Sequence, residues 1–315
     1  MKKLFVSAAI VASVMMGVNG NALAAGEKLV LSVPSLATPY EVTMRQAGLD
    51  YAKKIGVNLQ ALDGQNNSPK QVADLENAMT AGAQGFIISP NDEGAVAPAV
   101  DELVEGGRVV VTIDRSTNSK HKVPHFGTDP YQGGVVSAEF IKKQFPNGAE
   151  IFLLTGQPGA SSNIQRLKGI HDSLKQNGDK YPIVVEQTGN WMRSEGLRIV
   201  QSIWPGMKKK PQVIFGMNDD MALGAIEALQ TMGYKPGEIM VMGFNAGAEA
   251  LARVRDGWMA VTYDLQQGYM VQKAMDQILA NLRDKTPVEG MIVQPLAITK
   301  DNLKDATEFD AIDNY

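Results

Sequence analysis

The chain has 315 residues, of which 44% are hydrophobic and 20% are charged, so its composition is that of an ordinary globular protein long enough for about two domains. Its net charge of −4 argues against nucleic acid or an anionic membrane surface as a partner. Cysteine is absent, which excludes disulfide bonds and a lipid anchor on cysteine, so large hydrophobic cores must stabilise the fold.

The first 24 residues have the pattern of a signal peptide. Lys2 and Lys3 precede an apolar run over 4–18, and the small residues around Leu23 form a typical cleavage site. No later stretch approaches the roughly 20 apolar residues that span a bilayer. We therefore expect export to the periplasm of a Gram-negative cell, where the cleaved protein is freely soluble.

After this leader, apolar segments of strand length alternate with longer segments of helical period. Strands are expected at 29–33, 57–62, 85–89 and 109–113, with helices at 39–55, 68–81 and 94–105. The alternation then repeats, with strands at 151–154, 183–186, 213–215, 239–242, 260–263 and 291–294, and helices at 132–144, 162–176, 193–203, 219–232, 248–256 and 268–282. Repeated β-α-β units predict parallel sheets with right-handed crossovers. The chain is therefore expected to be an α/β protein with two lobes joined by short crossings.

The strand expected at 109–113 ends abruptly in Asp114 and Arg115. In open α/β sheets, ligands bind beyond the carboxyl ends of the strands. An aspartate that only accepts hydrogen bonds, next to an arginine with five donors, suits a polyhydroxylated ligand, because each hydroxyl is both donor and acceptor. The alternative is that this pair only caps a loop.

Further candidates follow later strands. Trp191 lies in an expected loop, where an indole face can pack against the C–H face of a sugar ring. Asn218 precedes an expected helix, and the alternative is that it only caps that helix. Arg166 lies on a helix, where the alternative is a solvated surface. Asn245 follows the strand expected at 239–242.

Six sequence blocks, in their order and spacing, resemble the periplasmic sugar-binding proteins of the ribose-binding type. They are NNSPKQ, IDRS, TGQPGASSNIQR, NDDMALGAIEALQ, GFNAG and MVQKAMDQIL. The resemblance covers the whole chain after the leader and implies the fold of a type I periplasmic binding protein, with two Rossmann-like lobes and a three-crossing hinge. It implies an N-terminal lobe of 25–128 plus 266–294 and a C-terminal lobe of 129–265 plus 295–315.

The resemblance also implies a monosaccharide enclosed between the lobes. Asp114 and Arg115 match the acid–arginine pair that holds ring hydroxyls, and Arg166 matches a second binding arginine. Trp191 falls where the family has an aromatic residue that stacks on the ring. Tyr40 aligns with the aromatic residue that follows the first-strand proline.

Three more positions come from the second lobe and the hinge. Asn218 matches the family's asparagine before an acidic helix start, whereas Asn245 stands where the family usually has aspartate. The hinge strand aligns with an ambiguity of two residues, so that either Asp264 or Gln266 takes the family's polar hinge role.

Two departures from the family bear on the ligand. Glu41 stands where ribose-type proteins have a second aromatic residue, and Thr38 stands where asparagine is usual. A lost aromatic face and a gained carboxylate indicate a ligand more polar than ribose, such as a hexose, a polyol or an inositol. In this hypothesis the Glu41 carboxylate accepts hydrogen bonds from ligand hydroxyls. The alternative is that Glu41 only complements the dipole of its helix.

The expected protein is a monomeric solute receptor that closes over its ligand and delivers it to an inner-membrane ABC permease. An alternative partner is a chemoreceptor or a sensor kinase. An enzyme is not expected, because the three histidines have no acid–base spacing and no nucleophile elbow or Walker loop is present. No cofactor or metal cluster is expected, although the segment 159–162 leaves a phosphate cradle open as an alternative. Repressors of the lactose type share the fold but carry a helix-turn-helix where this chain has its leader.

Overall fold

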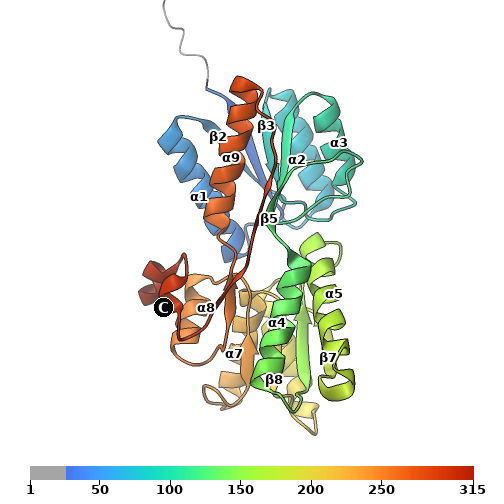
Figure 1. Cartoon of the computed structure of the whole chain (residues 1–315), viewed down its shortest axis with the longest axis vertical. Coiled ribbons are helices and arrows are strands. Elements are labelled where there is room, and N and C mark those ends of the chain that lie inside the picture. Colours follow the sequence, from blue (N-terminus) through green and yellow to red (C-terminus); the bar gives the residue numbers. More distant parts are fainter. Residues whose placement is uncertain (1–25) are drawn as a thin grey trace, which may run out of the picture.

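The computed structural model describes residues 26–315, so the expected signal peptide at 1–24 lies outside the described residues. The chain forms two α/β lobes, arranged end to end along the long axis of the molecule (Figure 1). None of the described helices is long and apolar enough to cross a membrane.

The first lobe is built on a six-stranded parallel sheet with the order β11-β5-β4-β3-β1-β2. Its strands are β1 (Lys28–Val33), β2 (Asn58–Asp63), β3 (Gly85–Ile88), β4 (Val109–Ile113), β5 (His125–Thr128) and β11 (Met291–Val293). Its helices are α1 (Pro39–Ile55), α2 (Ser68–Thr80), α3 (Ala97–Glu105) and α9 (Gln267–Asp284). Strands β3 and β4 are almost wholly buried, as expected for a parallel sheet covered on both faces.

The second lobe is built on a four-stranded parallel sheet with the order β7-β6-β8-β9. Its strands are β6 (Ile151–Thr155), β7 (Ile183–Thr188), β8 (Val213–Gly216) and β9 (Met240–Met242). Its helices are α4 (Pro130–Gln144), α5 (Ser161–Lys175), α6 (Arg193–Ile203), α7 (Asp219–Thr231) and α8 (Ala248–Arg255). A two-stranded antiparallel ribbon joins β10 (Thr262–Asp264) to β12 (Leu296–Ile298). Short 3₁₀ helices lie at η1 (Gly178–Lys180), η2 (Trp204–Gly206), η3 (Leu303–Asp305) and η4 (Phe309–Asn314).

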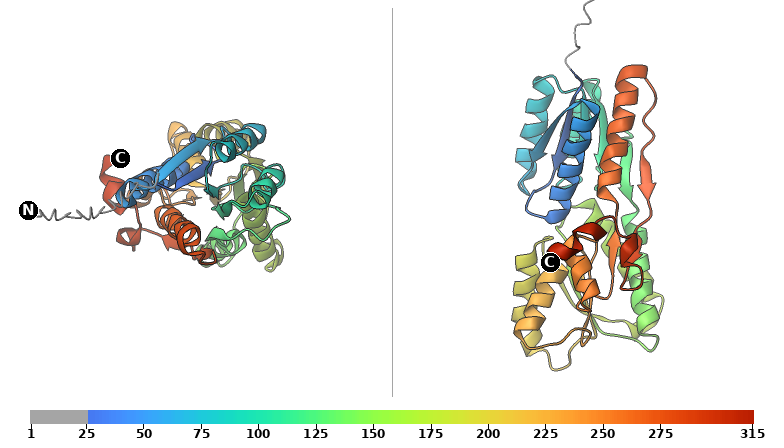
Figure 2. Two further views of the ribbon diagram at one scale, coloured as in Figure 1. Left: turned by 90° about the horizontal axis from the view of Figure 1, so that it is seen from above. Right: turned by 90° about the vertical axis from the view of Figure 1, so that its left-hand side faces the viewer.

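The chain passes between the lobes at three points within the described residues. It leaves the first lobe after β5, returns between β10 and α9, and leaves again between β11 and β12 (Figure 1). The last segment, η4, packs against α8 near the level at which the two lobes meet (Figure 2). Three connections of this kind are typical of a hinge between two lobes.

Two short strands were not predicted from the sequence. Strand β5 contains a glycine and has four residues, and it exists because β4 and β11 pair with it on either side. Strand β12 has three residues and pairs only with β10. Helix α3 begins at Ala97 rather than at Gly94, because the Asp92 carboxylate accepts hydrogen bonds from the next backbone N–H groups and forms a turn there.

Candidate ligand-binding site

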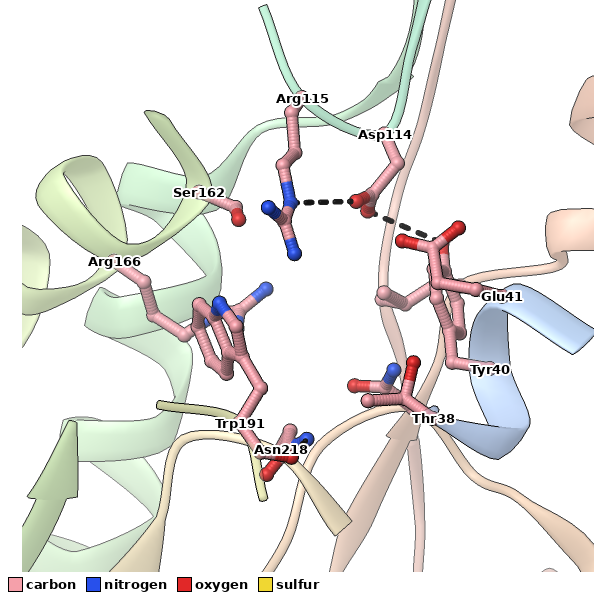
Figure 3. Close-up of a pocket in the computed structure, with 11 residues that line it drawn as sticks. Thr38, Tyr40, Glu41, Asp114, Arg115, Ser162, Arg166, Trp191 and Asn218 are labelled. Carbon is pink, nitrogen blue, oxygen red and sulfur yellow. Dashed lines mark hydrogen bonds and ion pairs between the residues drawn. The ribbon is translucent and has the colours of Figure 1, made fainter. Parts of the chain in front are cut away.

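A cavity lies between the two lobes, at the carboxyl ends of β4, β7, β8 and β9 (Figure 3). Eleven side chains from both lobes line it. They are Thr38, Tyr40, Glu41, Asp114, Arg115, Ser162, Arg166, Trp191, Asn218, Asn245 and Leu265. The structure therefore brings together every expected site residue except two, from segments that are far apart in the sequence.

The wall from the first lobe combines the start of α1 with the end of β4. Tyr40 Oη donates a hydrogen bond to Asp114 Oδ1 over 3.2 Å, and Arg115 Nε lies 3.7 Å from Asp114 Oδ2. Arg115 also donates from Nη1 to the Asn91 carbonyl oxygen at 3.4 Å. The Asp114 carboxylate thus lies between the Tyr40 phenol and the Arg115 guanidinium, and all three groups face the cavity (Figure 3).

The wall from the second lobe is centred on Arg166, which is 4% exposed. Its Nη1 donates to the Met217 carbonyl oxygen at 2.8 Å, and its guanidinium lies 3.7 Å from the ring centroid of Phe244. Burial lowers the pKa of Arg166 to about 10, so the side chain keeps its charge at neutral pH. Phe244 does not line the cavity; it supports the arginine and stacks on Tyr263.

Trp191 lies near both arginines, with its ring centroid 6.0 Å from Arg115 Cζ and 5.9 Å from Arg166 Cζ. Gly156 makes this position possible, since a Cβ atom there would lie 2.0 Å from Cζ2 of the indole. Asn218 Nδ2 donates to the Trp191 carbonyl oxygen at 2.9 Å, and Asn218 Oδ1 accepts from the backbone N–H of Met221 at 3.0 Å. Asn218 is therefore a helix cap, and it also fixes the loop that carries the indole.

The backbone of the site is strained at several positions. Asp114, Trp191 and Asn245 have φ values of +59°, +65° and +129°, a region that residues other than glycine rarely adopt. Such conformations cost of order 1–3 kcal/mol each and persist where the surrounding structure holds them. Their concentration around one cavity is typical of a binding site that is organised before its ligand arrives.

Four buried polar atoms of the lining have no hydrogen-bond partner within the protein: Glu41 Oε2, Arg115 Nε, Arg166 Nε and Trp191 Nε1. Most buried polar atoms in native proteins are paired, so this group of four at one cavity indicates capacity kept for a ligand. The set contains nitrogen donors and a carboxyl oxygen, which matches a ligand whose hydroxyl groups both donate and accept.

Glu41 is the most unusual member of the lining. The residue is 3% exposed and follows Tyr40 in the first turn of α1. Burial, reinforced by the charge of Asp114 and opposed by Arg115, raises the pKa of Glu41 to about 8. The sequence predicts a carboxylate at this position, whereas this pKa makes the neutral acid the main form at pH 7.

Comparison with known proteins gives the family. A model of the periplasmic binding protein domain matches residues 29–286. The chain belongs to this family. It is 34% identical over 252 residues to the ribose import binding protein of Bacillus subtilis (strain 168), which covers 79% of this chain and 80% of the relative. It is 26% identical over 310 residues to a putative rhizopine-binding protein of Rhizobium meliloti, covering 96% of this chain and 98% of the relative.

Among solved structures, the chain resembles the Caulobacter myo-inositol binding protein bound to myo-inositol. The identity is 39%, the TM-score is 0.88, and the match covers 90% of this chain and 97% of the other. The predicted family and the predicted type I fold are both confirmed.

In this periplasmic binding protein, Asp264 and Gln266 do not line the cavity between the lobes. Asp264 Oδ1 accepts from the Gln266 backbone N–H at 2.8 Å, and Asp264 Oδ2 accepts from the Thr307 backbone N–H at 2.6 Å. The carboxylate therefore ties the hinge to the C-terminal segment. The residue between them, Leu265, lines the cavity instead, because Gln266 adopts a left-handed conformation that turns the chain at this point.

Ser162 and Leu265 line the cavity but were not predicted as ligand contacts. Ser162 lies in the segment 159–162, for which a phosphate cradle was the open alternative. The structure disfavours that alternative, since Gly159 lies against the Asp92 carboxylate and Ser161 Oγ already accepts from the Ser116 backbone N–H. Within residues 26–315 there is likewise no cluster of His, Asp or Glu that could hold a metal ion.

A second, acidic cavity adjoins the first and shares Tyr40 and Asn245 with it. Its lining includes Asp219 and Asp220 at the start of α7. Burial raises the pKa of Asp219 to about 6 and that of Asp220 to about 7. Asp219 has a structural role, because it accepts hydrogen bonds from Thr262 Oγ1 at 2.6 Å and from a backbone N–H of α8's cap at 2.9 Å.

Proposed function

We propose that this periplasmic binding protein is a receptor for a monosaccharide or cyclic polyol, with myo-inositol as the ligand that suits it best, and that it delivers the ligand to an ABC import permease. One observation carries the proposal: the cavity between the lobes is surrounded by unpaired donors and acceptors and by one indole face. The Caulobacter relative, which is 39% identical, supports it as a protein solved with bound myo-inositol.

The polarity of the lining supports a fully hydroxylated ring over ribose. Six of the eleven lining side chains are charged or carry an amide, and Trp191, Tyr40 and Leu265 provide the apolar surface. A site that is built to pair hydroxyl groups discriminates strongly against ligands that lack one of them, because its own buried polar groups then stay unpaired. Glu41 adds one more buried polar group that needs a ligand hydroxyl, at the position where the ribose-type proteins have an aromatic side chain.

The geometry also supports a closing motion. Glu41, Arg166 and Trp191 are 3%, 4% and 6% exposed, so the lobes must separate before a ligand can enter. The three crossings between the lobes act as the hinge of this motion. The closed form presents both lobes together, and we propose that the permease recognises this form.

The remaining features of the proposal concern the protein's setting. Residues 1–24 direct export to the periplasm, where the protein works as a monomer. It releases its ligand chemically unchanged. The lobe boundaries at 128, 265 and 294 serve as the hinge points.

A thermal-shift screen tests the proposal. Unfolding is measured for the chain without residues 1–24, with myo-inositol, glucose, galactose, xylitol and ribose at the same concentration. A ligand that binds only the native state stabilises it by about 2.7 kcal/mol at one hundred times its Kd. The largest upward shift is expected for myo-inositol. A screen in which no sugar or polyol raises the melting temperature contradicts the proposal.

A further inference from the structure

We propose that Glu41 contacts the ligand as a neutral carboxylic acid, and that closing the two lobes takes up a proton at this residue. The inference rests on the proposed function and concerns the same cavity. Position 41 departs from the ribose-type pattern. A protonated Glu41 can donate a hydrogen bond to the ligand there, which an ionised carboxylate cannot do.

Glu41 is buried without a cation of its own. The residue is 3% exposed, and its Oε2 has no hydrogen-bond partner within the protein. The ion pair at this wall joins Arg115 to Asp114 instead, over 3.7 Å. A buried carboxylate without its own cation carries a large desolvation cost, which a proton removes.

The charges around Glu41 act in the same direction. Figure 3 shows its carboxyl group on the same side of the cavity as Asp114, whose oxygen also accepts from Tyr40. Asp114 disfavours a second negative charge there, and Arg115 offsets this only in part. Together with burial, these groups raise the pKa of Glu41 to about 8, against an ordinary value of 4.5.

Ligand entry requires an opening that changes these surroundings. In the open form water reaches Glu41 and removes the burial that is the main cause of its raised pKa, so the pKa falls towards the ordinary value. Asp114 and Arg115 belong to the same lobe as Glu41 and stay beside it in both forms. A pKa that is higher in the closed form makes closure most favourable below the ordinary pKa, and this contribution is lost as the pH rises to about 8. The affinity of the protein for its ligand should therefore weaken by up to tenfold per pH unit between about pH 5 and pH 8. Above about pH 8 the affinity should no longer change with pH.

The neutral acid also explains what the residue contributes to recognition. A protonated carboxyl group donates one hydrogen bond and accepts others, as an amide does. It can thus pair with a ligand hydroxyl that already donates to Asp114. A ligand ring with a hydroxyl group next to Glu41 therefore binds tightly, and a ring without this hydroxyl leaves Glu41 without a hydrogen-bond partner.

Other ionisable groups near the cleft also have shifted pKa values, and their effects must be separated from that of Glu41. Burial lowers the pKa of His125, with Asp114 opposing, and burial raises the pKa of Asp219, Asp220 and Glu308. Glu41→Gln removes the titrating group and keeps a neutral donor and acceptor. Asp220→Asn is the comparison variant, because it removes a second buried acid that lies outside the ligand cavity and reaches its lining only through Asn218 Nδ2 at 3.5 Å, a contact that the asparagine can keep.

The test is calorimetry with myo-inositol at pH 7 in two buffers of different ionisation enthalpy, which together count the protons exchanged on binding. Uptake of close to one proton at Glu41 is expected for the wild-type protein, and it should remain in Asp220→Asn, which removes any contribution of Asp220 to the total. Glu41→Gln should bind within about tenfold of the wild-type affinity, with no uptake at this site and with a flat pH profile between pH 6 and pH 8.

Three results overturn the inference. They are binding without proton uptake, uptake that survives unchanged in Glu41→Gln, and a Glu41→Gln variant that loses binding while wild-type affinity rises with pH. The last result would make Glu41 an anionic acceptor. In all three cases myo-inositol still binds, so the proposed function stands. If no ring ligand binds at all, the proposed function fails, and this inference fails with it.

Discussion

Gly156→Ala should cost ligand affinity without disrupting the fold. A Cβ atom at this position would lie 2.0 Å from Cζ2 and 2.2 Å from Cε2 of Trp191, so the indole has to move. Gly156 has no positive φ, and the new methyl group therefore adds no backbone strain of its own. Its backbone N–H can keep the hydrogen bond to Asn163 Oδ1 at 2.7 Å.

The size of the effect follows from two contributions. Overpacking a tight site costs about 1–3 kcal/mol, and a displaced aromatic face loses a further ~0.5–1.5 kcal/mol of stacking. Together they amount to about 1.5–4.5 kcal/mol, and since about 1.4 kcal/mol is tenfold in affinity, the dissociation constant for the ligand should rise by roughly 10- to 1,000-fold.

Calorimetric titration with myo-inositol measures this change, and circular dichroism checks that the fold is retained. Gly206→Ala is the matched control, because a Cβ atom there would meet no heavy atom within 4 Å, and its affinity should be unchanged. If Gly156→Ala binds as tightly as the wild-type protein, Trp191 does not contact the ligand in the way we infer.

Three other predictions concern single side chains. Asp114→Ala and Arg115→Ala should each weaken binding at least tenfold in calorimetry, because hydrogen bonds to charged groups contribute about 1.5–3 kcal/mol; unchanged affinity would remove that residue from the site. Trp191→Phe, with the other two tryptophans retained, should abolish most of the fluorescence change on ligand addition, and an intact change would place Trp191 outside the closing cleft. Burial raises the pKa of Asp220 to about 7, so the native state loses stability as the pH rises from about 4 to 7. Asp220→Asn should remove this loss and be more stable at pH 8 by roughly 1–2 kcal/mol in denaturant titrations, a figure reduced for the solvent that reaches this partly buried side chain; equal stability at pH 8 would contradict it.

Much of the fold could be predicted because its signals are local. The apolar strand at 109–113 and the helix opened by Pro39 are visible in short windows of sequence, and both appear as β4 and α1. Strand β5 could not be predicted in this way, since four residues that include a glycine form a strand only between two partners. The end of β4 likewise indicated Asp114, because polar residues after buried strands gather at one edge of a parallel sheet.

The arrangement within the site depended on contacts that sequence does not show. Tyr40 and Asp114 are 74 positions apart, and only their contact places Glu41 next to a second acid. Either Asp264 or Gln266 was expected at the ligand, but neither lines the cavity, and the Asp264 carboxylate accepts from Thr307, 43 positions later in the chain. Such pairings arise from the way the C-terminal segment folds back, and no local pattern reports them.

The most direct test of ligand choice is a pair of calorimetric titrations at pH 7, one with myo-inositol and one with ribose, on the chain without residues 1–24. We predict that myo-inositol binds with a Kd of about 1 μM or below, equivalent to roughly −8 kcal/mol, and that ribose binds at least tenfold more weakly. Tighter binding of ribose, or no heat with either ligand, would contradict the claim that this cavity is built for a fully hydroxylated ring.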